Sequence, residues 1–109
     1  MKILLLDQNL FGATRVESNL THHGHAVVVC SQLEDGDFDS IIWNFGNPKW
    51  TLDNIIPAVK EARSQFPDAR LLGFCGHREV DKWKVAQSAG VRVVSNDAML
   101  SDAGAQLEK

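Results

Sequence analysis

Polar side chains at the ends of two apolar runs are the residues whose types and positions could do chemistry. Asp7 and Gln8 directly follow the aliphatic run of residues 2–6, and Asn44 ends the run of residues 38–44. Short unalternating apolar runs bounded by turn residues are typical of strands buried on both faces of a parallel sheet. Sites in open α/β sheets form beyond the carboxyl ends of such strands, so we expect a site between Asp7 and Asn44. Asparagine is neither a nucleophile nor a strong ligand for hard cations, so this site has one carboxylate and no evident nucleophile.

The pattern along the chain predicts the elements that position this edge. Strands are expected at residues 2–6, 25–30, 38–44, 70–75 and 91–94. Apolar residues at helical spacing predict helices over residues 11–23, from a cap at Asp53 or Asn54 to about residue 66, over residues 79–89, and from a cap at residues 96–97 onward. Residues 31–37 are too few for an ordinary crossover helix. The expected fold class is α/β, a parallel five-stranded sheet with helices on both faces and the second crossover helix shortened or absent.

The composition of the chain limits the classes of protein to which it can belong. The chain has 109 residues, 44% of them apolar, which fits one domain over residues 1–109 with a core of normal size. Its net charge is −3, so no basic footprint for nucleic acid is present. No apolar stretch is long enough to cross a bilayer, and no signal peptide is recognisable, so we expect a cytoplasmic protein. Cys30 and Cys75 lie in apolar runs and are expected to be buried, reduced thiols.

A small group of histidines has the residue type of a metal site but not its spacing. His22, His23 and His25 surround Gly24 at the expected junction of a helix with a strand. Metal binding needs three or four converging ligands, whereas adjacent side chains at a helix end point apart. We therefore interpret these histidines as side chains whose positive charge interacts favourably with a helix C-terminus, and we expect no metal and no cofactor.

Three segments carry a resemblance to a known family. Residues 2–7 (Lys-Ile-Leu-Leu-Leu-Asp), residues 20–28 (Leu-Thr-His-His-Gly-His-Ala-Val-Val) and residues 89–91 (Ala-Gly-Val) stand in order and at compatible spacing. In this the chain resembles the receiver domain of two-component response regulators over nearly its whole length. The resemblance implies a flavodoxin-like sheet with strand order 2-1-3-4-5.

The resemblance also implies a chemistry. Receiver domains accept a phosphoryl group on an aspartate at the end of the third strand, because the nucleophile must be a carboxylate. That aspartate and acidic residues after the first strand hold Mg²⁺, which prefers anionic oxygen ligands. A threonine or serine after the fourth strand and a lysine after the fifth contact the phosphoryl group.

This chain departs from that chemistry at most positions. The acceptor position falls on Asn44, one magnesium carboxylate on Gln8, the hydroxyl on Cys75 or Gly76, and the lysine near Asn96. We therefore interpret Asp7, Gln8, Asn44, Cys75 and Asn96 as a vestigial phosphorylation pocket, with Trp43 at its border, in a protein that is not an enzyme.

The expected function is that of an atypical, pseudo-receiver module that binds a protein partner or itself without phosphorylation. In receivers the usual contact surface is the face of the fourth helix, fifth strand and fifth helix, which here implies Lys82, Trp83, Val91 and Met99 as interface candidates. Trp50 is either an interface anchor or a residue that folds back on the following helix. The alternative reading is a phosphorylatable or small-ligand-binding flavodoxin-like domain. A regulatory domain cut from a longer protein is a third possibility.

Overall fold

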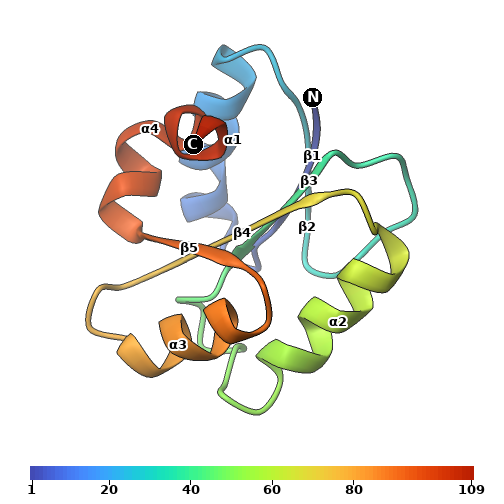
Figure 1. Ribbon diagram of the computed structural model, residues 1–109. Helices are drawn as coiled ribbons and strands as arrows, with labels where there is room; N and C mark the ends of the chain where they lie inside the picture. The colour runs from blue at the N-terminus through green and yellow to red at the C-terminus, as the bar shows by residue number, and fades with distance from the viewer.

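The computed structural model describes the backbone of residues 1–109 and every side chain except those of Leu10 and Phe11. Strands and helices alternate, with a single omission between the second and third strands (Figure 1). The strands are β1 (Lys2–Leu6), β2 (Ala26–Cys30), β3 (Ser40–Asn44), β4 (Arg70–Cys75) and β5 (Arg92–Ser95). The helices are α1 (Leu10–His22), α2 (Ile55–Gln65), α3 (Val80–Ser88) and α4 (Asn96–Glu108).

The sheet has five strands in the order β2-β1-β3-β4-β5, and every neighbouring pair is parallel. β1 lies between β2 and β3, with Leu4 opposite Val28 on one side and Ile41 on the other. The predicted fold class and strand order are therefore confirmed. Parallel pairing brings all carboxyl ends to one edge, which is where Asp7 follows β1 and Asn44 ends β3.

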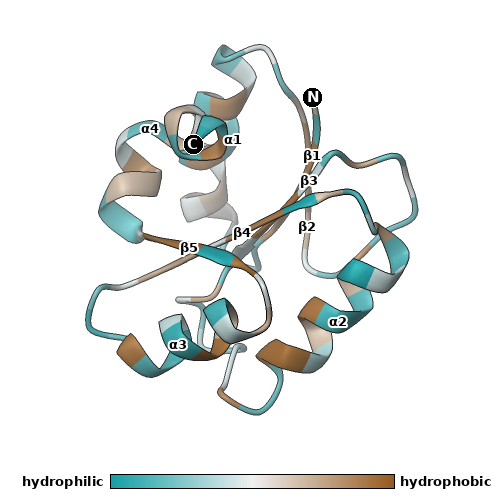
Figure 2. Cartoon of the chain, in the orientation of Figure 1, coloured by the Kyte–Doolittle hydropathy of each residue, from teal (hydrophilic) through white to brown (hydrophobic). Residues whose placement is uncertain are grey.

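Two apolar clusters, one on each face of the sheet, hold these layers together. One lies under α1 and α4 and includes Ile3, Leu5 and Met99; the other lies under α2 and α3 and includes Leu4, Trp43 and others. Successive residues of β1 enter opposite clusters, because side chains alternate between the faces of a strand. Figure 2 shows the hydrophobic strands running through the centre of the molecule between helices with mixed colouring.

The second crossover helix is absent, as the sequence predicted. Residues 31–39 connect β2 to β3 as bends and irregular backbone without a helix. Beside this connection is a hollow of about 370 Å³, whose wall includes Leu33, Trp43 and Trp50. β2, at the edge of the sheet, is correspondingly only half-buried over Val27 to Cys30.

Several element boundaries differ from those predicted. β3 begins at Ser40 rather than at residue 38, because Phe38 instead packs its ring edge against Phe66, with 5.7 Å between centroids. α4 is capped by Ser95, whose hydroxyl accepts a hydrogen bond from the Ala98 amide, and not by residues 96–97. α4 is also kinked at Asp102, whose φ of −161° and ψ of 88° are non-helical.

Asn54 does precede α2 as one of the two predicted caps, but it makes no side-chain cap bond. Its amide instead closes the preceding loop, accepting from the Thr51 amide and donating to the Lys49 carbonyl at 2.8 Å each. No helix among the residues that the structure describes is long and apolar enough to cross a membrane.

Candidate functional site

A cleft of about 220 Å³ opens at the carboxyl edge of the sheet, beyond β1 and β3. Its wall includes Asp7, Asn44 and Asn96, which are three of the residues predicted for a vestigial pocket. Asn9 and Asn47 also line it, so amide groups outnumber the one carboxylate. The predicted meeting of the first- and third-strand ends is therefore confirmed as geometry.

Asp7 is the buried charge of this cleft, with 4% of its surface exposed. Its Oδ2 accepts a hydrogen bond from the Asn44 side-chain amide at 3.1 Å, and its Oδ1 accepts one from the Asn9 backbone amide at 2.8 Å. Buried carboxylates require such donors, because an unpaired charge inside a protein is costly. Two neutral amides thus satisfy the carboxylate.

Asn44 is oriented by the turn that follows β3. Its Oδ1 accepts a hydrogen bond from the Gly46 amide at 3.1 Å, which leaves its NH₂ group directed at Asp7. Gly46 suits this turn because a Cβ there would come within 3.2 Å of Asn44 Oδ1. The Gly46 amide therefore fixes which end of the Asn44 side-chain amide meets the carboxylate.

Two of the predicted pocket residues lie elsewhere. Gln8 is exposed and is not part of the cleft wall. Cys75 is fully buried in the cluster under α2 and α3, while Phe74, its neighbour on β4, lines the cleft. The prediction for Cys75 was wrong because adjacent residues of a strand face opposite sides, and an apolar run does not reveal which side each residue takes.

Trp43 also faces away from the cleft, contrary to the prediction, for the same reason. It stacks on Phe45 with ring centroids 5.6 Å apart and lines the hollow beside residues 31–39, on the other face from the cleft. The expectation that Trp43 borders the pocket was therefore wrong.

The two thiols are free, as predicted, although Cys30 is only partly buried. Burial, with a smaller contribution from Glu79, raises the pKa of Cys75 to about 11. Burial, helped by a hydrogen bond with Glu34, likewise raises the pKa of Cys30 to about 11. Both remain protonated near neutral pH and are poor nucleophiles.

Asn96 stands where the resemblance implied a lysine. It lines the cleft and also a second hollow of about 280 Å³ that includes His77, Arg78 and Asp97. Its buried Oδ1 has no hydrogen-bond partner among the described residues. Asn96 therefore lines both an amide-rich cleft and a hollow whose wall includes Arg78 and Asp97.

A network at the start of α3 holds the loops after β3 and β4, and sequence reasoning missed it. Lys82 Nζ donates to the Phe45 carbonyl at 2.9 Å and pairs with Glu79 at 3.1 Å. Glu79 Oε2 accepts from the Gly76 amide, and Trp83 Nε1 donates to the Gly76 carbonyl, both at 3.1 Å. We call these contacts of Phe45, Gly76, Glu79, Lys82 and Trp83 the α3 network. The i, i+3 spacing of Glu79 and Lys82 was the available signal.

Two interface candidates proved to be core residues. Val91 is 3% exposed and Met99 is 0% exposed, so their assignment to a contact surface was wrong. Met99 shares a spacing of four with Ala103 and Leu107, and this spacing marks the stripe of α4 that faces the sheet. Trp50 is half-buried, with its ring edge against Phe45 at 5.5 Å between centroids.

The histidines do not converge. His23 Nε2 lies 2.8 Å from Asp102 Oδ1, whereas His25 Nδ1 lies 3.0 Å from the N-terminal amine. No group of three or more possible metal ligands occurs among the described residues. Burial, followed by the nearby N-terminal charge, lowers the pKa of His25.

Comparison with known proteins supports the fold and stops there. No family model and no curated protein sequence matches the chain. Among solved structures, the crystal structure of adenylate cyclase from Rhodopirellula baltica is similar, with a TM-score of 0.69 and 17% sequence identity. The match covers 92% of this chain and 87% of that chain. At this identity the likeness concerns the fold alone: the chain has a flavodoxin-like, receiver-like fold.

Proposed function

We propose that this chain is a pseudo-receiver, a signalling module that binds a protein partner or a second copy of itself without being phosphorylated. The observation that carries the proposal is the hydrogen bond from the Asn44 amide to Asp7 at 3.1 Å. The amide occupies the position at which a receiver would present its acceptor carboxylate. An amide nitrogen in this arrangement neither attacks phosphorus nor adds negative charge for a divalent ion.

The surroundings of Asn44 support the same conclusion. The cleft wall contributes one carboxylate, Asp7, and both of its oxygens already accept hydrogen bonds. Mg²⁺ sites with several waters still use one or two carboxylates together with phosphate oxygens. A single, already satisfied carboxylate is a weak starting point for such a site.

The α3 network supports a module with one conformational state. A switching receiver needs two arrangements of the loops around its site, with a small free-energy difference between them. Here the Gly76 amide and carbonyl are both engaged by α3 side chains, and Lys82 engages the Phe45 carbonyl. These contacts favour a fixed arrangement of the two loops.

The contact surface that we propose is the face of α3, β5 and α4. Val80, at the start of α3, is 50% exposed, and Trp83 is half-buried one turn later. Lys82 has 16% of its side chain exposed and is held by the α3 network, so it contributes to this face as a fixed charge. An exposed apolar residue beside a partly covered tryptophan is the composition of interface anchors.

Intact mass after incubation with acetyl phosphate and Mg²⁺ tests the absence of phosphorylation. The expected result is an unchanged mass for the wild-type chain. An added phosphoryl mass that base removes would overturn the proposal.

A sedimentation-velocity concentration series with Val80→Asp and Trp83→Ala then tests the contact surface, with Lys60→Asp on α2 as the control. Self-association that weakens in the first two variants and not in the control identifies the partner as a second copy.

The alternative, a ligand-binding or phosphorylatable site, has one observation in its favour. The buried Oδ1 of Asn96 has no hydrogen-bond partner among the residues that the structure describes, and amides dominate the wall of the neighbouring cleft. Backbone amide shifts of Asn9 and Gly46 during a magnesium titration discriminate between the two functions. Saturable shifts at millimolar Mg²⁺ favour the alternative. We propose no cyclase activity from the name of the similar structure, since only the fold is shared.

A further inference from the structure

We infer that a second site, at the opposite edge of the sheet, binds a small phosphate monoester. A pocket of about 290 Å³ opens where β4 and β5 begin and α4 ends. Because the strands are parallel, this edge is the one farthest from the Asp7 cleft. The site is therefore separate from the proposed receiver-like site and does not depend on it.

The charge of this pocket is opposite in sign to that of the whole molecule. Arg70, Arg92 and Lys109 line it, and no acidic side chain does, although the chain carries a net charge of −3. None of the three forms an ion pair with a side chain that the structure describes. Glu108, the nearest acidic residue in sequence to Lys109, lies toward His23 at 3.9 Å. None of the three cations is therefore neutralised by an acidic side chain that the structure describes.

The two arginines are held in place by the end of α4. Arg70 Nη1 donates to the Leu107 carbonyl at 2.9 Å, and Arg92 Nη1 donates to the Gln106 carbonyl. These bonds satisfy helix-terminal carbonyls, which is a structural role in itself. A guanidinium has five N–H donors, however, so each arginine keeps most of its donors for another acceptor.

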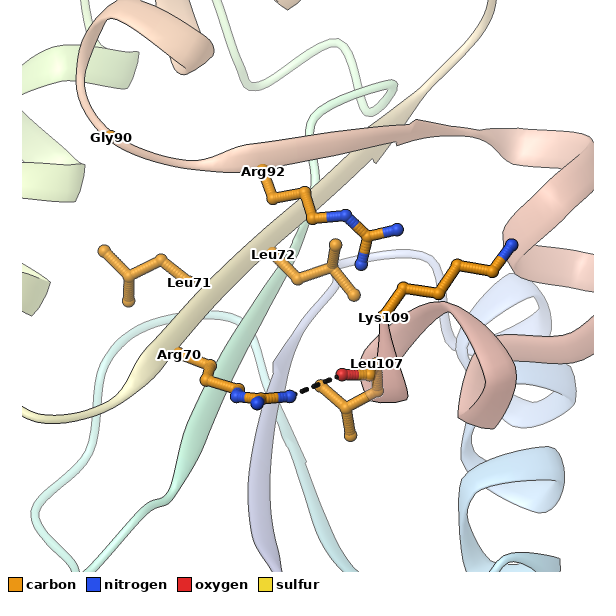
Figure 3. A pocket seen from close by; sticks show the side chains of 7 residues that line it. All are labelled: Arg70, Leu71, Leu72, Gly90, Arg92, Leu107 and Lys109. Carbon is orange, nitrogen blue, oxygen red and sulfur yellow. Dashed lines mark hydrogen bonds between the residues drawn. The ribbon is translucent and has the colours of Figure 1, made fainter.

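Figure 3 shows how the charges are disposed around the opening. Arg70 turns toward the Leu107 carbonyl, Arg92 extends above Leu72 in this view, and the Lys109 side chain extends away from Leu107. The carbonyls at the helix end carry only about half a negative charge, which is less than the charge of the Arg70 and Arg92 guanidiniums that donate to them. An anion placed among these groups is favoured.

The chemistry of the lining selects the class of anion. Paired guanidinium forks match the oxygens of a phosphate and bind it through charge-assisted hydrogen bonds. A phosphate monoester, which approaches two negative charges at neutral pH, balances three cations better than a single carboxylate does. Leu71, Leu72 and Leu107 form the apolar part of the wall, and a volume near 290 Å³ leaves room for a compact organic body.

A titration followed by amide chemical shifts tests the site, with phenyl phosphate and inorganic phosphate as probes at constant ionic strength. The expected result is saturable shifts confined to Arg70 through Leu72, Gly90 through Arg92 and Leu107 through Lys109. Tighter binding of phenyl phosphate assigns a role to the leucine wall, whereas equal affinity assigns the site to the phosphate group alone. Absence of saturable shifts, or shifts spread over all exposed cations, overturns the inference.

Matched variants make the test specific. Arg92→Gln is expected to weaken phenyl phosphate binding at least about tenfold, because a hydrogen bond to a charged group is lost. Lys60→Gln, which removes one exposed charge on α2, is expected to leave the affinity unchanged. Lys109 makes no hydrogen bond to a helix carbonyl that the structure describes, so Lys109→Gln replaces Arg92→Gln as the test if the latter fails to fold. Lys109→Gln is expected to weaken phenyl phosphate binding about threefold. Equal losses in the control and the pocket variants overturn the inference.

Discussion

The side-chain amide of Asn44 donates a hydrogen bond to Oδ2 of Asp7 across 3.1 Å, joining the ends of the first and third strands. In a divalent-metal site, a cation would sit between such strand ends and hold their oxygens together. Here a neutral donor on one strand meets the charge on the other. The carboxyl ends of β1 and β3 are thus joined by a contact that needs neither ion nor phosphate.

Replacing Asn44 with Asp should destabilise the protein at neutral pH. The change removes the donor to Asp7 and places a second carboxylate beside it, so the free energy of unfolding should fall by about 1–3 kcal/mol. Repulsion raises the pKa of one carboxyl of the pair above its unfolded value of about 4. The loss should therefore be absent below about pH 4 and develop as the pH rises through the raised pKa, as urea unfolding across pH can measure.

Asn47→Asp is the matched control for that change. Asn47 lines the same cleft, and its Oδ1 accepts from the Lys49 amide at 3.0 Å, a bond that a carboxylate retains. Asn47→Asp should therefore lose less stability than Asn44→Asp. Millimolar Mg²⁺ should restore stability to Asn44→Asp and not to Asn47→Asp. Equal losses in the two variants would show that added charge alone, and not the bond to Asp7, matters.

Lys82→Met should loosen the loops after β3 and β4. The substitution keeps an unbranched side chain but removes the donor to the Phe45 carbonyl and the pair with Glu79. A hydrogen bond from a charged group in a partly buried position is worth about 1.5–3 kcal/mol, so unfolding should become easier by an amount in this range. Hydrogen exchange of the amides after β3 should also accelerate.

Lys84→Met provides the comparison for this result. Lys84 lies on the same helix and is exposed, with no hydrogen bond to any residue that the structure describes. It should be close to neutral in both stability and exchange. A similar effect in both lysine variants would argue against the α3 network as the source of rigidity.

Stability in the acid range should depend on Asp102. A hydrogen bond from the Ala105 amide, and secondarily contact with His23, holds the pKa of Asp102 below its usual value. A depressed folded-state pKa stabilises the protein above the unfolded pKa and ceases to do so as the pH falls through the folded value. The wild type should therefore exceed Asp102→Asn in stability at pH 6, and the two curves should approach one another in the acid range. Exposed Asp68, changed to Asn, should show no such convergence.

Gly104→Ala should lower the melting temperature although alanine favours helices. Helix propensity alone favours alanine by about 1 kcal/mol at this position. A Cβ at Gly104, however, would overlap the His23 ring, with Nε2 only 2.6 Å away. Combining Gly104→Ala with His23→Ala removes the obstacle, so the double variant should be more stable than the sum of the single effects. Additive losses would contradict this packing explanation.

The sheet was predictable because its strands are nearly continuous apolar runs. β1 and β4 have the predicted bounds, and residues 31–37 were too few for an ordinary helical crossover. The resemblance to receivers supplied the strand order, which pattern alone leaves open. The position of Asn44 at the end of β3 followed from the turn residues behind it.

The errors concern faces, not elements. Both faces of the sheet are covered, so the two apolar runs that contain Trp43 and Cys75 show no alternation that would assign each side chain to a cluster. Met99 was misplaced although its spacing with Ala103 and Leu107 marked it as inward-facing. The α3 network joins side chains to distant backbone groups, and only its i, i+3 pair of Glu79 and Lys82 could be read from the sequence.

The connection over residues 31–39 gives the molecule a natural place for attachments. β1 and β3 keep their register, Leu4 opposite Ile41, although no helix bridges β2 to β3. Asp35, Gly36 and Asp37 are exposed at its tip. Doubling the length of a flexible loop costs only about 0.6 kcal/mol. A tag or fluorescent reporter inserted beside Gly36 would therefore cost little stability.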